Sequence, residues 1–183
     1  MNNRMLQLQI FLRSILRKLG LSPFLAKFFY PKGYETNFDN ALLESIRSGD
    51  VVCDVGANVG HYTKKFSDLA GPEGTVCAFE PMPETFEILS EGTCQLSNVK
   101  LFCMALGVSD ETLSMTNRET KSVMNKIILD TDVVENIDII NIVVAMSDGL
   151  IERNEAETPN VIKIDVEGHE ADVLAGMPLL LAD

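Results

Sequence analysis

Short apolar runs alternate with helical segments over most of this chain, and this rhythm limits the folds that it can adopt. The apolar runs are strand-length and cover residues 51–55, 75–79, 99–106 and 161–164. Helical character is found between and beside them, at residues 40–47, 61–69, 83–91 and 170–174. Strands that alternate with helices favour a parallel sheet covered on both faces. The predicted fold class is therefore α/β.

The rhythm breaks between Asp110 and Asn154. Residues 112–115 and 141–146 are expected to form two extra strands, which flank a polar stretch. Within that stretch, residues 121–138 carry no pattern that assigns them to a helix or a strand.

The first 37 residues are predicted to be a separate basic, amphipathic, helical segment. Residues 1–34 hold six of the 15 basic residues and no acid, which leaves nine basic residues with all 27 acids. Residues 5–19 place apolar side chains on one helical face and basic ones on the other. Two roles stay open: packing against the main domain, residues 38–183, or peripheral contact of residues 4–32 with anionic lipid.

Charge and composition exclude several classes of protein. The acidic main domain is a poor candidate for binding a nucleic-acid backbone. No apolar run approaches the roughly 18–20 residues that span a bilayer. The four cysteines form no CxxC pair and only two histidines are present, so zinc-finger spacing does not occur. Free thiols in apolar runs are typical of a reducing compartment, and we expect a cytoplasmic protein, with peripheral membrane contact as the open alternative.

The sequence DVGANVG at residues 54–60 directly follows the first apolar run and directly precedes a helical segment. That context is the one that a nucleotide-binding loop requires. Gly56 and Gly60 let the backbone approach a ligand closely and turn tightly. The helix that follows offers free N–H groups at its start.

A strand-end acid adds specificity to this loop. Glu80 stands 20 positions after Gly60, at the end of the second apolar run, where it can accept hydrogen bonds from both ribose hydroxyls of a nucleoside. Nicotinamide-dependent oxidoreductases and methyltransferases both use this pair of elements. The loop lacks the G-x-G-x-x-G order that places a pyrophosphate on the helix. Its acid Asp54 also suits a cationic or amino-acid-bearing ligand better, and the pattern therefore favours a methyltransferase.

A dense group of ionisable side chains follows the fourth apolar run, in the sequence KIDVEGHE at residues 163–170. Ligands of open α/β sheets bind at the carboxyl ends of the strands, where these side chains emerge. Mutual perturbation among these three acids, the lysine and the histidine could tune one group as a general base. The alternatives are a metal site and simple capping of the following helix; no metal is predicted.

At this point the residues resemble the FkbM family of methyltransferases. The resemblance rests on four blocks that occur in order: residues 54–60, Phe79-Glu80-Pro81, residues 98–107, and above all Lys163-Ile-Asp-Val-Glu-Gly-His-Glu170. It implies a Rossmann-like class I fold that binds S-adenosylmethionine. It also implies O-methylation of a hydroxyl, often on a sugar or a polyketide-like small-molecule acceptor.

The resemblance also implies individual roles. Asp54, Gly56, Asn58 and Gly60 match the loop that holds the methionine part of the cofactor, and Glu80 matches the ribose ligand. Met104 and Ala105 match the stretch beside the adenine. Asp165 matches the strand-end acid near the transferred methyl, and the catalytic base stays open among Asp165, Glu167 and His169.

The family fold continues with further strands past the position of Asp183. We therefore expect the domain to be incomplete at its C-terminus and β-strand 161–164 to lie near an open edge. The rival interpretations are a non-catalytic S-adenosylmethionine-binding module and a nicotinamide-dependent oxidoreductase.

Overall fold

The computed structural model describes residues 34–117 and 138–182. The chain divides into two compact units, residues 1–42 and 43–183, which are described separately. Helix α3 (Tyr34–Ser45) begins earlier than the predicted 40–47, because no glycine or proline interrupts its sequence. The predicted N-terminal helix at 5–19, the lipid-contact region 4–32 and most of the polar stretch 121–138 lie outside the described residues. No helix in the described ranges is both long and apolar enough to cross a membrane.

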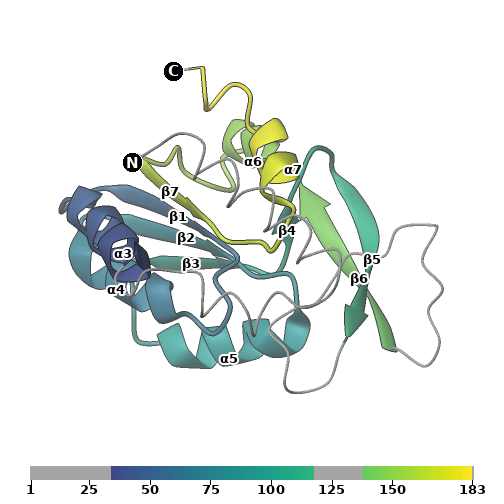
Figure 1. Cartoon of the computed structure of the whole chain (residues 1–183), viewed down its shortest axis with the longest axis horizontal. Helices are drawn as coiled ribbons and strands as arrows, with labels where there is room; N and C mark the ends of the chain where they lie inside the picture. The colour runs from purple at the N-terminus through teal and green to yellow at the C-terminus, as the bar shows by residue number, and fades with distance from the viewer. Residues whose placement is uncertain (1–33, 118–137, 183) are drawn as a thin grey trace. The chain divides into compact units, whose positions relative to one another are not determined.

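A four-stranded parallel sheet forms the centre of the second unit, in the order β3-β2-β1-β7 (Figure 1). Its strands are β1 (Val51–Val55), β2 (Thr75–Phe79), β3 (Val99–Phe102) and β7 (Val161–Ile164). Helix α4 (His61–Ala70) connects β1 to β2, and α5 (Pro83–Thr93) connects β2 to β3. The parallel α/β prediction is thus confirmed. The chain order reverses at β1, which places a topological switch point between β1 and β7.

Both faces of this sheet are buried, as a parallel sheet with helices on each side requires. On one face, Cys53 and Val55 of β1 pack with Cys77 and Phe79 of β2. Helix α7 (Glu170–Ala175) covers this face with Val173, and Met177 follows it. On the other face, Ala78 packs against Leu89 of α5.

A second, smaller sheet has the order β4-β6-β5, with β4 (Ala105–Leu106), β5 (Glu111–Asn117) and β6 (Asp138–Ala145). The predicted single strand 99–106 is therefore wrong: it divides into β3 and β4, which belong to different sheets. The N–H of Glu80 still donates to the Phe102 carbonyl (3.1 Å). After the break at residues 103–104, Leu106 pairs with Ala145 of β6 instead of with β2.

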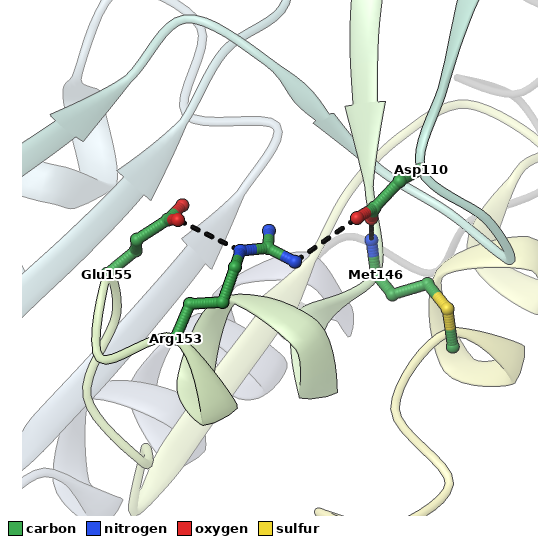
Figure 2. Close-up of polar contacts among 4 residues, drawn as sticks. All are labelled: Asp110, Met146, Arg153 and Glu155. Atoms are coloured by element: carbon green, nitrogen blue, oxygen red, sulfur yellow. Dashed lines mark hydrogen bonds and ion pairs between the residues drawn. The ribbon is translucent and has the colours of Figure 1, made fainter.

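Helix α6 (Ser147–Glu152) was not predicted, because six residues are too few to display a helical period. Polar contacts between residues far apart in the sequence hold both ends of this helix (Figure 2). Asp110 accepts a hydrogen bond from the Met146 N–H (2.8 Å) and pairs with Arg153 (3.2 Å), which also pairs with Glu155 (2.9 Å). The Met146 hydrogen bond and the Arg153 charge lower the pKa of Asp110. These contacts join the residue before β5 to both ends of α6.

The segment after α7 is fixed by a buried carboxylate. Asp148 of α6 accepts hydrogen bonds from the N–H groups of Leu179 (2.7 Å) and Leu180 (3.1 Å). Gly176 lies so close to the Gly107 carbonyl oxygen that an added Cβ would sit 1.9 Å from it. The C-terminal turns therefore pack against both α6 and the end of β4.

Candidate active site at the carboxyl ends of β1, β2 and β7

The loop at residues 56–60 turns from β1 toward β2 and then into α4. The N–H groups of Gly56 and Ala57 both donate to the Phe79 carbonyl at the end of β2 (3.0 Å each). Gly56, Asn58 and Gly60 have positive φ angles of 76°, 51° and 84°. Such backbone suits glycine and asparagine best, which explains these residue types at these positions.

The close neighbour of Gly56 is the backbone of the protein itself. A Cβ built on Gly56 would lie 2.1 Å from the Asp165 carbonyl oxygen. A Cβ on Gly60 would lie 2.7 Å from the Leu89 side chain of α5. The close approach of a ligand to these glycines stays a prediction, and the structure adds a second reason for glycine at both positions. Their lack of a side chain lets the loop pack against the segment after β7 and lets α4 begin beside α5.

Glu80 lies at the end of β2, with a side chain held by the loop. One carboxylate oxygen accepts the Asn58 N–H (3.0 Å) and the other accepts the Met82 N–H (3.0 Å). The residue is 7% exposed. Burial raises the pKa of Glu80, and the two N–H groups partly oppose that rise. Each carboxylate oxygen has a second lone pair, so Glu80 retains the capacity to accept hydrogen bonds from a ligand.

The raised pKa of Glu80 predicts a pH dependence of stability. Because the folded chain holds this proton more tightly than the unfolded chain, ionisation of Glu80 costs stability as the pH rises from 4.5 through the folded pKa. We expect the difference in free energy of unfolding between the wild type and Glu80→Ala to fall over that range and then to become constant. Urea unfolding at a series of pH values measures it. A difference that grows with pH would show the opposite sign of pKa shift.

Asp54 lies beneath the loop, on β1, and is fully buried. Its Oδ2 accepts a hydrogen bond from the Thr63 hydroxyl of α4 (2.7 Å). Its Oδ1 lies 3.0 Å from the ammonium nitrogen of Lys163, which β7 places in register with it. The carboxylate therefore faces α4 and β7.

The segment after β7 carries the three candidate catalytic residues beside the loop. The Asp165 N–H donates to the Val55 carbonyl (3.0 Å), and both Asp165 and Glu167 are exposed. Glu167 has a φ of 47°. His169 Nδ1 lies 3.0 Å from an oxygen of Asp172, and its side chain is 34% exposed. Within the described residues, 34–117 and 138–182, no group of three His, Cys, Asp or Glu side chains is placed to hold a metal ion.

Met104 and Ala105 lie where the chain passes from β3 to β4. Met104 packs against the core cluster that contains Phe79. Burial, and then the charge of Glu80, raise the pKa of Cys103, which places this stretch close to Glu80. Phe102, one residue earlier, stacks on Phe79 with ring centroids 4.6 Å apart.

Two residues of this site were not singled out from the sequence. Asp172 partners His169 at i, i+3 spacing, a signal that could have been read on the predicted helix. Lys163 was noted only as one of several ionisable residues, although it is 8% exposed and contacts both Asp54 and the Gly56 carbonyl. Its partners are Asp54 of β1 and Gly56 of the loop that follows. Both lie at least 107 positions away along the chain, so no local pattern reveals them.

The strand order, the glycine loop after β1 and the acid at the end of β2 define a Rossmann-like α/β fold. The methyltransferase FkbM domain matches residues 54–183. The chain belongs to this family.

Two curated relatives are similar to the chain. The hexuronic acid methyltransferase AglP of Haloferax volcanii is 32% identical over 74% of this chain and 53% of the relative. Methyltransferase 1 of Beauveria bassiana is 30% identical over 69% of this chain and 57% of the relative. Among solved structures, a SAM dependent methyltransferase from Aquifex aeolicus is 25% identical, with 47% of this chain and 50% of that chain covered at a TM-score of 0.36. The chain thus spans little more than half the length of the curated relatives it matches.

Proposed function

We propose that this protein transfers a methyl group from S-adenosylmethionine to a hydroxyl of a sugar or another small molecule. The observation that carries the proposal is the buried carboxylate of Glu80, held by two backbone N–H groups at the carboxyl edge of the sheet. The sugar acceptor is supported by the relative named a hexuronic acid methyltransferase.

The residues at this edge fit the cofactor chemically. Glu80 is proposed to accept hydrogen bonds from the ribose hydroxyls, because its oxygens keep free lone pairs. The loop with Gly56, Asn58 and Gly60 would hold the methionine part of the cofactor. Asp54, buried beneath the loop, would help to hold the same part. Met104 and Ala105 would lie beside the adenine; they follow Phe102, whose carbonyl accepts the Glu80 N–H (3.1 Å).

For the chemical step, the chain needs to position an acceptor oxygen and to remove its proton. Bound S-adenosylmethionine supplies a methyl on a positively charged sulfur. The acceptor oxygen would form its bond to this methyl as the S–C bond breaks, with the bonding pair left on sulfur. We propose His169 as the base that takes the hydroxyl proton, because Asp172 contacts Nδ1 and leaves Nε2 for the acceptor. Asp165 and Glu167 are the alternative bases.

Incubation with S-adenosylmethionine and a panel of neutral sugars, hexuronic acids and other alcohols tests the function. We expect S-adenosylhomocysteine and a product heavier by one methylene unit, both seen by mass spectrometry. A chain that binds S-adenosylhomocysteine and gives no product with any acceptor would instead be a non-catalytic binding module. A chain that binds NADH and not S-adenosylhomocysteine would be an oxidoreductase.

We also propose that residues 1–37 are a basic segment distinct from the methyltransferase domain at 38–183, and that the protein is cytoplasmic. The positive charge of residues 4–32 supports peripheral contact with an anionic membrane. Sedimentation with phosphatidylserine vesicles, compared between the full chain and a chain that lacks residues 1–30, tests the contact. Equal sedimentation of the two would exclude it.

A further inference from the structure

Lys163 is a buried cation on β7, the strand beside β1 at one end of the described four-stranded sheet. Its side chain is 8% exposed, and its strand position is opposite Asp54 of β1. Burial of a lysine is costly, and an apolar side chain of similar length could fill the same space. Its contacts therefore need an explanation beyond packing.

Three groups surround the ammonium of Lys163. The Gly56 carbonyl oxygen accepts its hydrogen bond at 2.8 Å. Asp54 Oδ1 lies at 3.0 Å, yet this oxygen accepts no hydrogen bond of suitable angle from any residue that the structure describes. The Tyr62 ring of α4 lies with its centroid 5.4 Å away. Asp54 thus supplies the negative charge that balances Lys163. The hydrogen bond of the lysine ammonium goes to the Gly56 carbonyl of the loop.

The same two segments are joined a second time. The Asp165 N–H donates to the Val55 carbonyl at 3.0 Å, and the Asp165 carbonyl limits the space beside Gly56. Lys163 stands two residues before Asp165 and bonds to the residue after Val55. Two hydrogen bonds, Lys163 to Gly56 and Asp165 to Val55, therefore join the end of β1 to the end of β7.

We propose that Lys163 is a positioning residue that holds the loop 56–60 in the conformation in which the Asn58 N–H meets Glu80. The Lys163–Gly56 bond fixes the first peptide of the loop, and the Asn58–Glu80 bond fixes the middle. Loss of the first bond frees the loop and thereby weakens cofactor binding. The cofactor part of this inference rests on the proposed function.

A neutral pair of substitutions separates positioning from charge balance. Lys163→Met alone leaves Asp54 buried without a counter-ion, so it is expected to lower the urea midpoint strongly. Asp54→Asn with Lys163→Met removes both charges and is expected to recover most of that midpoint. The bond to the Gly56 carbonyl stays lost. Lys100→Met is the matched control, because Lys100 is also a paired lysine on this sheet but half-exposed, on β3.

Two readouts decide the proposal. Amide hydrogen exchange of residues 56–60, measured without any cofactor, is expected to be at least tenfold faster in the neutral pair than in Lys100→Met. The Kd for S-adenosylhomocysteine, from calorimetry, is expected to be at least tenfold higher in the neutral pair than in Asp54→Asn alone, and to stay unchanged in Lys100→Met. Wild-type exchange and affinity in a folded neutral pair would overturn the proposal.

Failure of the proposed function gives a different result. If the wild-type chain does not bind S-adenosylhomocysteine, the cofactor assignment fails, and the exchange rates alone still decide whether Lys163 positions the loop. Asp54→Asn with Lys163→Leu provides a second neutral pair of different side-chain shape. If neither pair folds, Lys163 is required for folding itself, and the proposal is contradicted.

Discussion

Replacement of Gly56 by alanine is expected to lower the free energy of unfolding by about 2–5 kcal/mol, as the sum of backbone strain and overpacking. The strain arises because Gly56 has a φ of 76°, which an alanine adopts at a cost. The overpacking arises because the new Cβ would lie 2.1 Å from the Asp165 carbonyl oxygen. The Asp165 backbone, directly after β7, cannot yield without straining its hydrogen bond to the Val55 carbonyl, so the clash cannot be relieved cheaply. Urea unfolding measures the loss.

Gly49→Ala is the matched control for this prediction. Gly49 also has a positive φ, 90°, but a Cβ there would meet no described atom within 4 Å. It should cost only the conformational strain, roughly 1–2 kcal/mol. If the two substitutions cost the same, the close packing of the loop against Asp165 contributes nothing measurable.

The second large effect is expected at the proposed base. His169→Gln should lower kcat by about 10²–10⁴-fold, the usual contribution of a positioned general base. The KM for S-adenosylmethionine and the affinity for S-adenosylhomocysteine should stay close to those of the wild type, because a base acts on the acceptor. Asp172→Asn should lower kcat less than His169→Gln does, because it disturbs only the orientation of the imidazole.

Parallel variants distinguish the three candidate bases. Asp165→Asn and Glu167→Gln are measured beside His169→Gln under single-turnover conditions with the same acceptor. If one of the carboxylate variants loses more than a hundredfold while His169→Gln keeps at least a tenth of the wild-type rate, the base is that carboxylate. Cofactor affinity measured for all three separates loss of chemistry from loss of binding.

The central part of the fold could be predicted because its signals are local. The strands 51–55, 75–79 and 161–164 are short apolar runs bounded by turn residues, and the structure confirms each with the same limits. The helices between them begin after a glycine or at a proline, where the sequence marks their starts. The parallel arrangement follows from the alternation itself.

The extra strands predicted at 112–115 and 141–146 are confirmed within β5 and β6, except that residue 146 lies outside β6. The joining of these strands with β4 into a second sheet, and the detailed contacts, could not be predicted because they depend on tertiary structure. The division of residues 99–106 into β3 and β4 is set by the exchange of partner from β2 to β6, and residues 103–104 carry no glycine or proline that announces it. Glu80 was identified by its spacing from the loop. Its bonds to Asn58 and Met82, which make it a support of the loop, required the structure.

The protein contacts of Gly56 and Gly60 likewise could not be predicted from the sequence. The sequence predicts close approach of a ligand at Gly56 and Gly60, and it gives no sign of the protein atoms that also lie close. The structure identifies Asp165 and Leu89. The partnership of Lys163 with Gly56 is equally beyond sequence reasoning, since it joins two strands far apart in the chain.

Calorimetric titration of S-adenosylhomocysteine into the 183-residue chain, and into Glu80→Ala, tests the central claim most directly. We expect saturable binding near 1:1 in the wild type. In Glu80→Ala we expect affinity to fall by about 1.5–3 kcal/mol, roughly tenfold to more than a hundredfold, the contribution of hydrogen bonds to a charged group. Circular dichroism of both proteins establishes that they are folded. A folded wild-type chain that does not bind, or one whose affinity is the same without Glu80, would contradict the cofactor site proposed at this edge of the sheet.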